Sequence, residues 1–193
     1  MNYEALHEVV LILMACVLAL ALAVIIERLI YYSYVERARR RLQALPADAA
    51  QGAVETELGR NDGPHARVLR GVQALARDAS AERADLRIQA LYLAQQAQLK
   101  RLLWVVDTAI TLSPLLGLLG TILGIIDTFT ALAAQGVSDP QAVSRGIGTA
   151  LVATGAGIGI AVFCLLFNNF FAECVERIND QLKVLALEAS GKA

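Results

Sequence analysis

Three long apolar stretches without a charged residue dominate the pattern of the chain. They cover residues 9–26, 108–126 and 146–172. As an α-helix, an 18-residue stretch rises about 27 Å, close to the roughly 30 Å hydrocarbon core of a bilayer. The third stretch is longer than a bilayer needs, so we expect it to tilt or to extend out of the membrane. The pattern therefore predicts three transmembrane helices.

Basic residues predict how these helices cross the membrane. The segment around and after the first span and the segment before the second are basic, with Arg28, Arg37, Arg39, Arg40, Arg41, Lys100 and Arg101. The residues before the first span include Glu4 and Glu8 but no Lys or Arg, which favours a retained span over a cleaved signal peptide. Between the second and third spans, Arg145 is the only basic residue. The positive-inside rule then places the N-terminus in the periplasm and the C-terminus in the cytoplasm.

The segment between the first two spans is expected to be mostly helical and cytoplasmic. Residues 44–64 contain Pro, Gly and small polar residues and are typical of a loop. An amphipathic helix is expected from Pro64, and Ser80 can cap a further helix. That further helix contains Leu86, Leu93 and Leu103, and we expect it to run without a break into the second span.

The third span has its own start and end signals. Asp139 can act as its N-cap, with Pro140 at the first helical position. Beyond the membrane the helix is expected to continue through residues 173–188, with Ile178, Leu182 and Leu185 on one stripe.

These elements predict an all-α membrane protein with three transmembrane helices and long cytoplasmic helical extensions. The expected segments are an outside segment and first span (1–34), a cytoplasmic helical segment (35–103), the second span (104–134), a short periplasmic loop (135–145), the third span (146–172) and a cytoplasmic C-terminal helix (173–193).

Composition agrees with a membrane protein and argues against several other classes. Hydrophobic residues make up 56% of the chain and charged residues 18%, and the net charge of −1 lacks the basic excess of a nucleic-acid-binding surface. Three cysteines show no disulfide or zinc spacing, and His7 and His65 stand isolated in the sequence. We therefore expect neither an enzyme nor a metal or other bound cofactor.

The second and third spans are rich in small residues. Gly117, Gly120 and Gly124 mark the second, and Gly155, Gly157 and Gly159 mark the third. Each contains a GxxxG pair, which allows helix backbones to approach closely in lipid. Packing between helices of one chain explains such glycines as readily as contact between subunits.

Polar residues inside the spans are the candidates for ion handling. Asp107, Thr121 and Thr128 fall near one stripe, and Thr154 and Asn168 share a face of the third span. These stripes suit a narrow wet lumen, but threonine hydroxyls that bond carbonyls one turn back would give the same pattern. Asp127 is the one carboxylate expected within the membrane, where ionisable groups are often functional, or else at its outer interface.

From Ser113 the sequence reads SPLLGLLGTILGIIDTFTALAAQGVSDPQAVSRGIGTALVATGAGIGIAVFCLLFNNF. This segment closely resembles the signature of the MotA/TolQ/ExbB proton-channel family in its three-span ExbB/TolQ branch. The resemblance implies an inner-membrane pentamer around a dimer of a single-span ExbD/TolR-like partner that carries an Asp in its span. It further implies that Thr121 and Thr154 line a path for protons, the driving ion. Such a complex would energise TonB-dependent uptake or Tol-Pal-type envelope processes through a TonB- or TolA-like protein.

Two residues depart from the family pattern. Thr149 stands where the pattern GIxEALxAT has Glu, and Phe163 stands where a later step has Pro. If the Glu assists proton transfer, Asp127 or the partner's Asp would have to act instead. The leading interpretation is an ion-driven energiser, with Thr149 as a further position on the proton pathway. The alternative, favoured by the missing Glu, is a non-conducting membrane scaffold that docks partner proteins.

Overall fold

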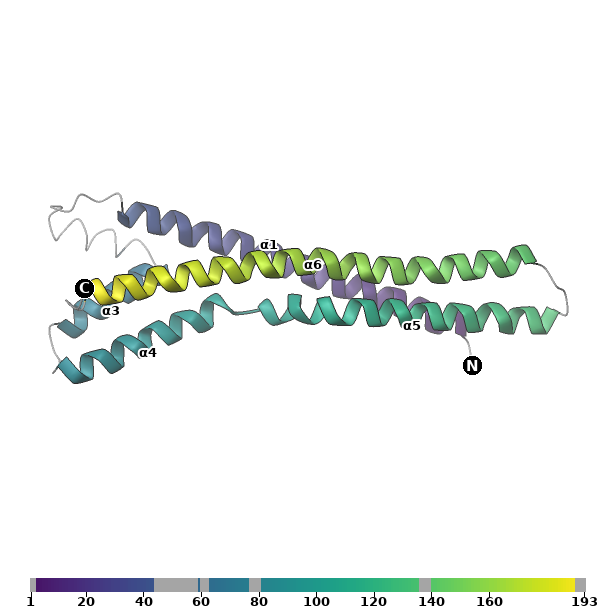
Figure 1. Ribbon diagram of the computed structural model, residues 1–193, viewed down its shortest axis with the longest axis horizontal. Coiled ribbons are helices and arrows are strands. Elements are labelled where there is room, and N and C mark those ends of the chain that lie inside the picture. The colour runs from purple at the N-terminus through teal and green to yellow at the C-terminus, as the bar shows by residue number, and fades with distance from the viewer. Residues whose placement is uncertain (1–2, 44–58, 60–62, 77–80, 136–139, 190–193) are drawn as a thin grey trace. The chain divides into compact units, whose positions relative to one another are not determined.

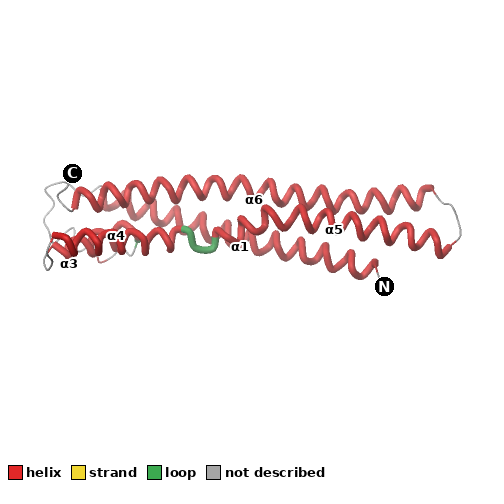
Figure 2. Tube along the Cα trace, turned by 60° about the horizontal axis from the view of Figure 1, so that its bottom comes forward, coloured by secondary structure: helices red, strands yellow, loops and turns green. Residues whose placement is uncertain are grey.

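The computed structural model describes residues 3–43, 59, 63–76, 81–135 and 140–189, and within these ranges it contains helices and no strand (Figures 1 and 2). The helices are α1 (Tyr3–Gln43), α3 (Pro64–Ala76), α4 (Ala81–Leu99), α5 (Leu103–Gln135) and α6 (Pro140–Ala189). Helices α1, α5 and α6 are each long and apolar enough to cross a membrane. The prediction of an all-α membrane protein with three spans is confirmed.

The chain forms two compact units, and α1 and α6 contribute residues to both. Unit 1 comprises Met1–Ile26 and Leu102–Asn169, and unit 2 comprises Glu27–Arg101 and Phe170–Ala193. Unit 1 therefore holds most of the apolar sequence and the candidate ion-handling residues.

In unit 1, α5 and the first part of α6 pack as an antiparallel pair. They approach closely at Gly117 and Gly157. A Cβ atom added to Gly117 would lie 2.8 Å from the carbonyl oxygen of Ala153 and 3.0 Å from the Cα atom of Thr154, and one added to Gly157 would collide with the carbonyl oxygen of Ser113. Since these neighbours are backbone atoms, glycine is required for this approach.

Helix α1 covers the same pair through one stripe of its surface. Val10, Met14, Ala21 and Ile25 are buried at helical spacing, and Val10 approaches Gly120 of α5. Many large apolar side chains of the three long helices remain exposed, including Ile12, Leu20, Leu115, Leu118, Val152 and Leu166. An exterior of this kind suits lipid or other membrane helices rather than water.

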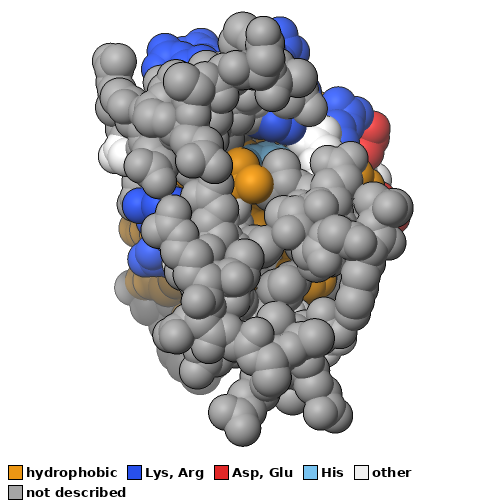
Figure 3. Space-filling view, turned by 90° about the vertical axis from the view of Figure 1, so that its left-hand side faces the viewer, with side chains coloured by type: hydrophobic (Ala, Val, Ile, Leu, Met, Phe, Trp, Pro, Cys, Tyr) orange, Lys and Arg blue, Asp and Glu red, His pale blue; other side chains and the backbone are white. Residues whose placement is uncertain are grey.

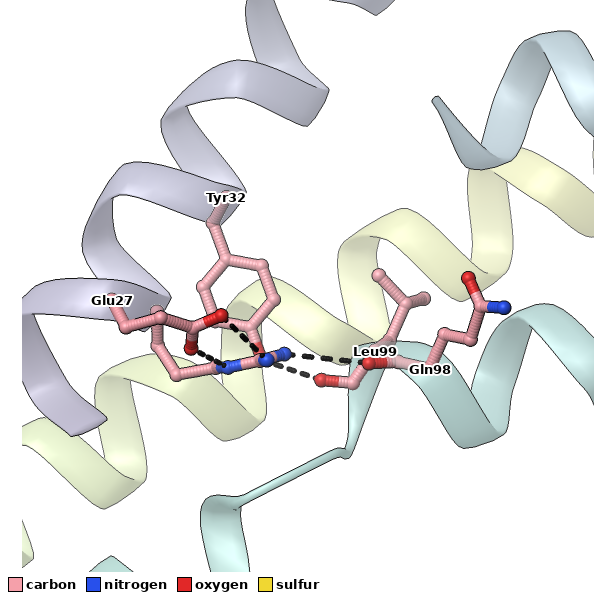
Figure 4. Close-up of polar contacts among 5 residues, drawn as sticks. Glu27, Tyr32, Gln98 and Leu99 are labelled. Carbon is pink, nitrogen blue, oxygen red and sulfur yellow. Dashed lines mark hydrogen bonds and ion pairs between the residues drawn. The ribbon is translucent and has the colours of Figure 1, made fainter. Parts of the chain in front are cut away.

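In unit 2, two side chains of α1 bind the C-terminal carbonyls of α4 (Figure 4). The Tyr32 hydroxyl donates a hydrogen bond to the carbonyl oxygen of Leu99 at 2.8 Å, and the Arg28 guanidinium donates one to that of Gln98 at 3.3 Å. Glu27 pairs with the same guanidinium at 2.5 Å. The last carbonyls of a helix have no partner within the helix, so these donors stabilise the end of α4.

The expectation of one helix running without a break from α4 into the second span is therefore wrong. Helix α4 ends at Leu99 and α5 begins at Leu103. Leu102 adopts a φ of 65°, in the left-handed region that terminates helices. We call residues 100–102 the α4–α5 joint. The break follows from this residue together with the donors from α1.

Several expected boundaries agree with the structure. Helix α3 begins at Pro64 and α6 at Pro140, and α6 continues to Ala189. Ile178 and Leu182 are buried on one stripe of α6. The proposed caps Ser80 and Asp139, most of the loop over residues 44–64 and the side chain of Leu185 lie outside the described residues.

Candidate functional site

Two threonine hydroxyls of unit 1 meet between α5 and α6, and we call Thr121 and Thr154 the threonine pair. The two Oγ1 atoms are in hydrogen-bond contact with each other. The Thr121 hydroxyl also lies 3.1 Å from the carbonyl oxygen of Gly117 and 3.0 Å from that of Ala150. The Thr154 hydroxyl lies 3.1 Å from the same Gly117 oxygen. The structure thus brings together two residues that lie 33 positions apart in the sequence.

The threonine pair can rearrange its protons without moving the helices. Each hydroxyl has a single proton to donate, whereas the pair has two carbonyl acceptors and each hydroxyl can also accept. The proton of Thr121 can therefore point to Ala150, to Gly117 or to Thr154. Both threonines are half-buried, so these residues have hydrogen-bond partners within the chain and are still partly accessible from outside it. A rotating hydroxyl pair of this kind can take part in a hydrogen-bonded relay.

The other threonines of these helices bond locally. The Thr128 hydroxyl donates to the carbonyl oxygen of Gly124 at 2.8 Å, and the Thr130 hydroxyl donates to that of Ile126 at 2.7 Å. Thr149 is exposed and donates to the carbonyl oxygen of Arg145 at 3.0 Å. The bond one turn back, which the sequence analysis set against a wet lumen, is therefore present at these three threonines, whereas the Thr121 hydroxyl also lies within bonding distance of α6.

Among the described contacts, no hydrogen bond joins Asp107, Asp127 or Asn168 to the threonine pair. Asp107 is exposed, and Asp127 and Asn168 are half-buried. The structure shows no hydrogen bond from Asp127 to a described residue. Its helical neighbour Thr130 instead bonds the Ile126 carbonyl.

The glycines of the two GxxxG pairs differ in their surroundings. A Cβ atom at Gly120 would lie 3.1 Å from Ala153, and one at Gly124 would lie 3.0 Å from Ala150, so both glycines pack within the chain. At Gly155 and Gly159 nothing lies within 4 Å of such an atom. The α6 pair is therefore open in the isolated chain.

His7 of α1 makes a polar contact with α5 that was not predicted from the sequence. Its Nδ1 atom lies 3.0 Å from the carbonyl oxygen of Gly120, a residue 113 positions away and directly before Thr121. His7 lies one turn before Val10 and so continues the buried stripe of α1. That stripe was the available signal. Across the described part of the chain, no three His, Cys, Asp or Glu side chains gather in a way that could hold a metal ion.

Residues 60–184 match the MotA/TolQ/ExbB proton channel family. This match covers more than half of the chain, including both helices that carry the threonine pair. The chain belongs to this family. It is accordingly a multi-pass membrane protein of the ExbB-like, three-span kind.

Relatives named after ExbB support this assignment. The chain is 37% identical over 161 residues to a putative biopolymer transport protein, ExbB-like 3, from Synechocystis sp.. The matched region covers 79% of this chain and 75% of that protein. It is 28% identical over 138 residues to an ExbB homolog from Methanothermobacter thermautotrophicus, over 70% of this chain and 47% of that protein. It is 30% identical over 87 residues to ExbB from Aquifex aeolicus, over 45% of this chain and 57% of that protein. The chain thus spans about half the length of the last two relatives.

Unit 2 of this ExbB-family chain contains the other histidine, and it is buried. His65 of α3 is only 2% exposed, and its ring nitrogens make no hydrogen bond of ordinary geometry to a described residue, although Gln181 lies beside the ring. Burial is the main cause that lowers the pKa of the imidazole, and the charge of Arg39 acts in the same direction. His65 is therefore expected to be neutral in the folded protein at neutral pH.

The surface of unit 2 carries many basic side chains. Figure 3 looks onto the end of this unit and shows Lys and Arg side chains along the upper and left margins of that face. Exposed basic residues of the unit include Arg37, Arg40, Arg41, Arg70, Lys100 and Arg101. The spans of unit 1, in contrast, expose mainly apolar side chains.

Proposed function

We propose that this chain is the ring-forming subunit of a proton-motive-force-driven complex in a bacterial inner membrane. Five copies would surround a dimer of a single-span ExbD/TolR-like protein. The complex would energise a TonB- or TolA-like protein and act as a motor rather than an enzyme. Membership of a proton channel family supports the use of protons, and relatives named as biopolymer transport proteins support a role in transport.

The observation that carries this proposal is the threonine pair. Two hydroxyls bridge α5 and α6 within apolar helices, where each has more than one possible hydrogen-bond partner. In lipid, hydroxyls of this kind hydrogen-bond across helices, and a pair with more acceptors than protons can in addition relay a proton. A membrane potential supplies about 2.3 kcal/mol per elementary charge per 100 mV, which is sufficient to drive conformational work.

The proposed orientation places the N-terminus in the periplasm and the basic surface of unit 2 in the cytoplasm. The exposed Arg and Lys side chains of unit 2 support this arrangement under the positive-inside rule.

The test is proton flux through the assembled complex. We would co-express the chain with its single-span partner, reconstitute the complex in liposomes and measure flux driven by a pH gradient. Thr154→Ala and Thr121→Ala are each expected to reduce flux at least tenfold without loss of assembly. Thr154→Ser keeps the hydroxyl and is expected to retain most of the flux.

Thr130→Ala provides the matched control, because Thr130 is exposed and bonds only a carbonyl of its own helix. It is expected to conduct as the wild type does. An intact complex without flux, even with the TonB- or TolA-like protein present, would refute the proposal.

A non-conducting scaffold is the second candidate. Its support is Thr149, which replaces an acidic residue of the family pattern and is engaged with the Arg145 carbonyl. In that case the complex would assemble and bind partners, yet Thr154→Ala would leave its cellular function unchanged.

A further inference from the structure

The imidazole of His7 lies against the part of α5 that carries Thr121. Its Nδ1 atom is 3.0 Å from the carbonyl oxygen of Gly120, and Gly120 immediately precedes Thr121. Its Cε1 atom lies 3.5 Å from the place that a Cβ atom of Gly124 would occupy. The ring thus lies against Gly120 and Gly124 of α5, and the absence of a side chain at these two positions leaves room for it.

The contact with Gly120 determines which ring nitrogen carries the proton. A carbonyl oxygen accepts hydrogen bonds and cannot donate one, so Nδ1 must be the protonated nitrogen of the neutral ring. The lone pair is then on Nε2, which makes no hydrogen bond to a described residue. The side chain is half-buried. His7 can therefore bind a proton at Nε2 and release it again while Nδ1 stays bonded to Gly120.

The other charged side chains described in unit 1 lack this connection. Glu8, Asp107 and Arg145 are exposed, and Asp127 is half-buried on the same face of α5 as Gly120 and Gly124. Among the described titratable groups of the unit, His7 is the one that hydrogen-bonds to another helix. Histidine also titrates closest to neutral pH of the side chains concerned.

We propose that His7 is a proton-carrying residue of this complex, beside the threonine pair. This inference rests on the proposed function. When the ring takes a proton from a hydronium ion, the O–H bond of that ion breaks and an N–H bond forms at Nε2. That N–H bond breaks when the proton passes to a water molecule beside the threonine pair, which becomes a hydronium ion and leaves the ring neutral.

The test is proton flux through liposomes that contain the complete complex, measured between pH 5.5 and 8. His7→Asn is the informative variant, because the Asn amide can donate to the Gly120 carbonyl but cannot carry a proton in this range. We expect flux to fall at least tenfold and the pH dependence around neutrality to disappear. Glu8→Gln, an exposed neighbour on the same helix, is the control and is expected to conduct as the wild type does.

A His7→Asn complex with wild-type flux and an unchanged pH profile would overturn the role of His7 while leaving the proposed function intact. An assembled wild-type complex without flux would overturn both.

A second measurement needs no variant. In ¹⁵N-histidine NMR spectra of the wild-type complex in bilayers, Nε2 of His7 should gain a proton as the pH falls from 8 to 5, while Nδ1 remains protonated throughout. An Nε2 signal that does not change over this range would also overturn the proposal.

Discussion

The close approach of α5 and α6 allows the effect of Gly117→Ala on the free energy of unfolding to be predicted. The added methyl carbon would lie 2.8 Å from the carbonyl oxygen of Ala153, whereas ordinary contacts begin at 3.4 Å. The helices must therefore separate by about 0.6 Å, the difference between these two distances. The same displacement would stretch the Thr154 hydrogen bond to the Gly117 carbonyl from 3.1 Å to as much as about 3.7 Å, where it ceases to be a hydrogen bond.

Two costs then add. Overpacking of a tight interface typically costs about 1–3 kcal/mol. An interhelical hydrogen bond in a membrane contributes on average about 0.6 kcal/mol. We therefore expect Gly117→Ala to lower the free energy of unfolding by about 2–3 kcal/mol.

The assay is reversible unfolding of the purified protein in mixed micelles with increasing SDS, followed by circular dichroism. Gly155→Ala is the control, because nothing in the chain lies within 4 Å of the added atom, and it should leave the unfolding free energy unchanged or slightly raised. If Gly117→Ala unfolds at the same SDS fraction as the wild type, the reasoning about backbone contact between α5 and α6 is wrong.

Three further predictions concern unit 2 and the α4–α5 joint. Tyr32→Phe leaves the buried Leu99 carbonyl without its donor and should destabilise the joint by about 1–2 kcal/mol. This should appear as faster amide hydrogen exchange around residues 99–103. Tyr34→Phe, at an exposed position of the same helix, should not change exchange there. Leu102→Gly keeps the left-handed conformation but removes its steric cost of about 1–2 kcal/mol for a residue with a Cβ atom, so it should raise the thermal midpoint. A lowered midpoint would contradict this interpretation of the φ angle. Because the pKa of His65 is lowered in the folded state, the unfolded state binds more protons at acidic pH. The free energy of unfolding, measured in an SDS series, should therefore fall as the pH drops below about 6.5, by at most about 1.4 kcal/mol per pH unit. His65→Leu should remove this part of the pH dependence.

The spans and several helix starts could be predicted because their causes are local. In lipid, backbone groups must be satisfied within the segment, so an uncharged apolar run of sufficient length becomes a helix. Pro64 and Pro140 begin helices because proline fits the first helical turn. The hydroxyl stripes of α5 and α6 were also visible in the sequence from helical spacing.

The remaining features depend on contacts between distant residues. The break after α4 follows from Leu102, a residue type that does not signal a helix end, and from donors on α1 that lie 67 and 70 residues away. The contact of His7 with Gly120 spans 113 residues. Spacing along one helix cannot give the register between two helices. The packing of backbone against backbone at Gly117 sets that register for the threonine pair.

The same packing determines where water can run. At Gly117 and Gly157 the backbones of α5 and α6 are in direct contact and leave no room for an added methyl group. A water molecule, with a radius of about 1.4 Å, would need a gap between the two backbones, and direct contact leaves none. A water-filled channel cannot pass between these two helices of one chain at this level. At this level α5 and α6 therefore form a closed surface, and water could reach the half-buried threonine hydroxyls only from outside that surface. Any pore that uses them must be enclosed by more surfaces than one copy of the chain provides.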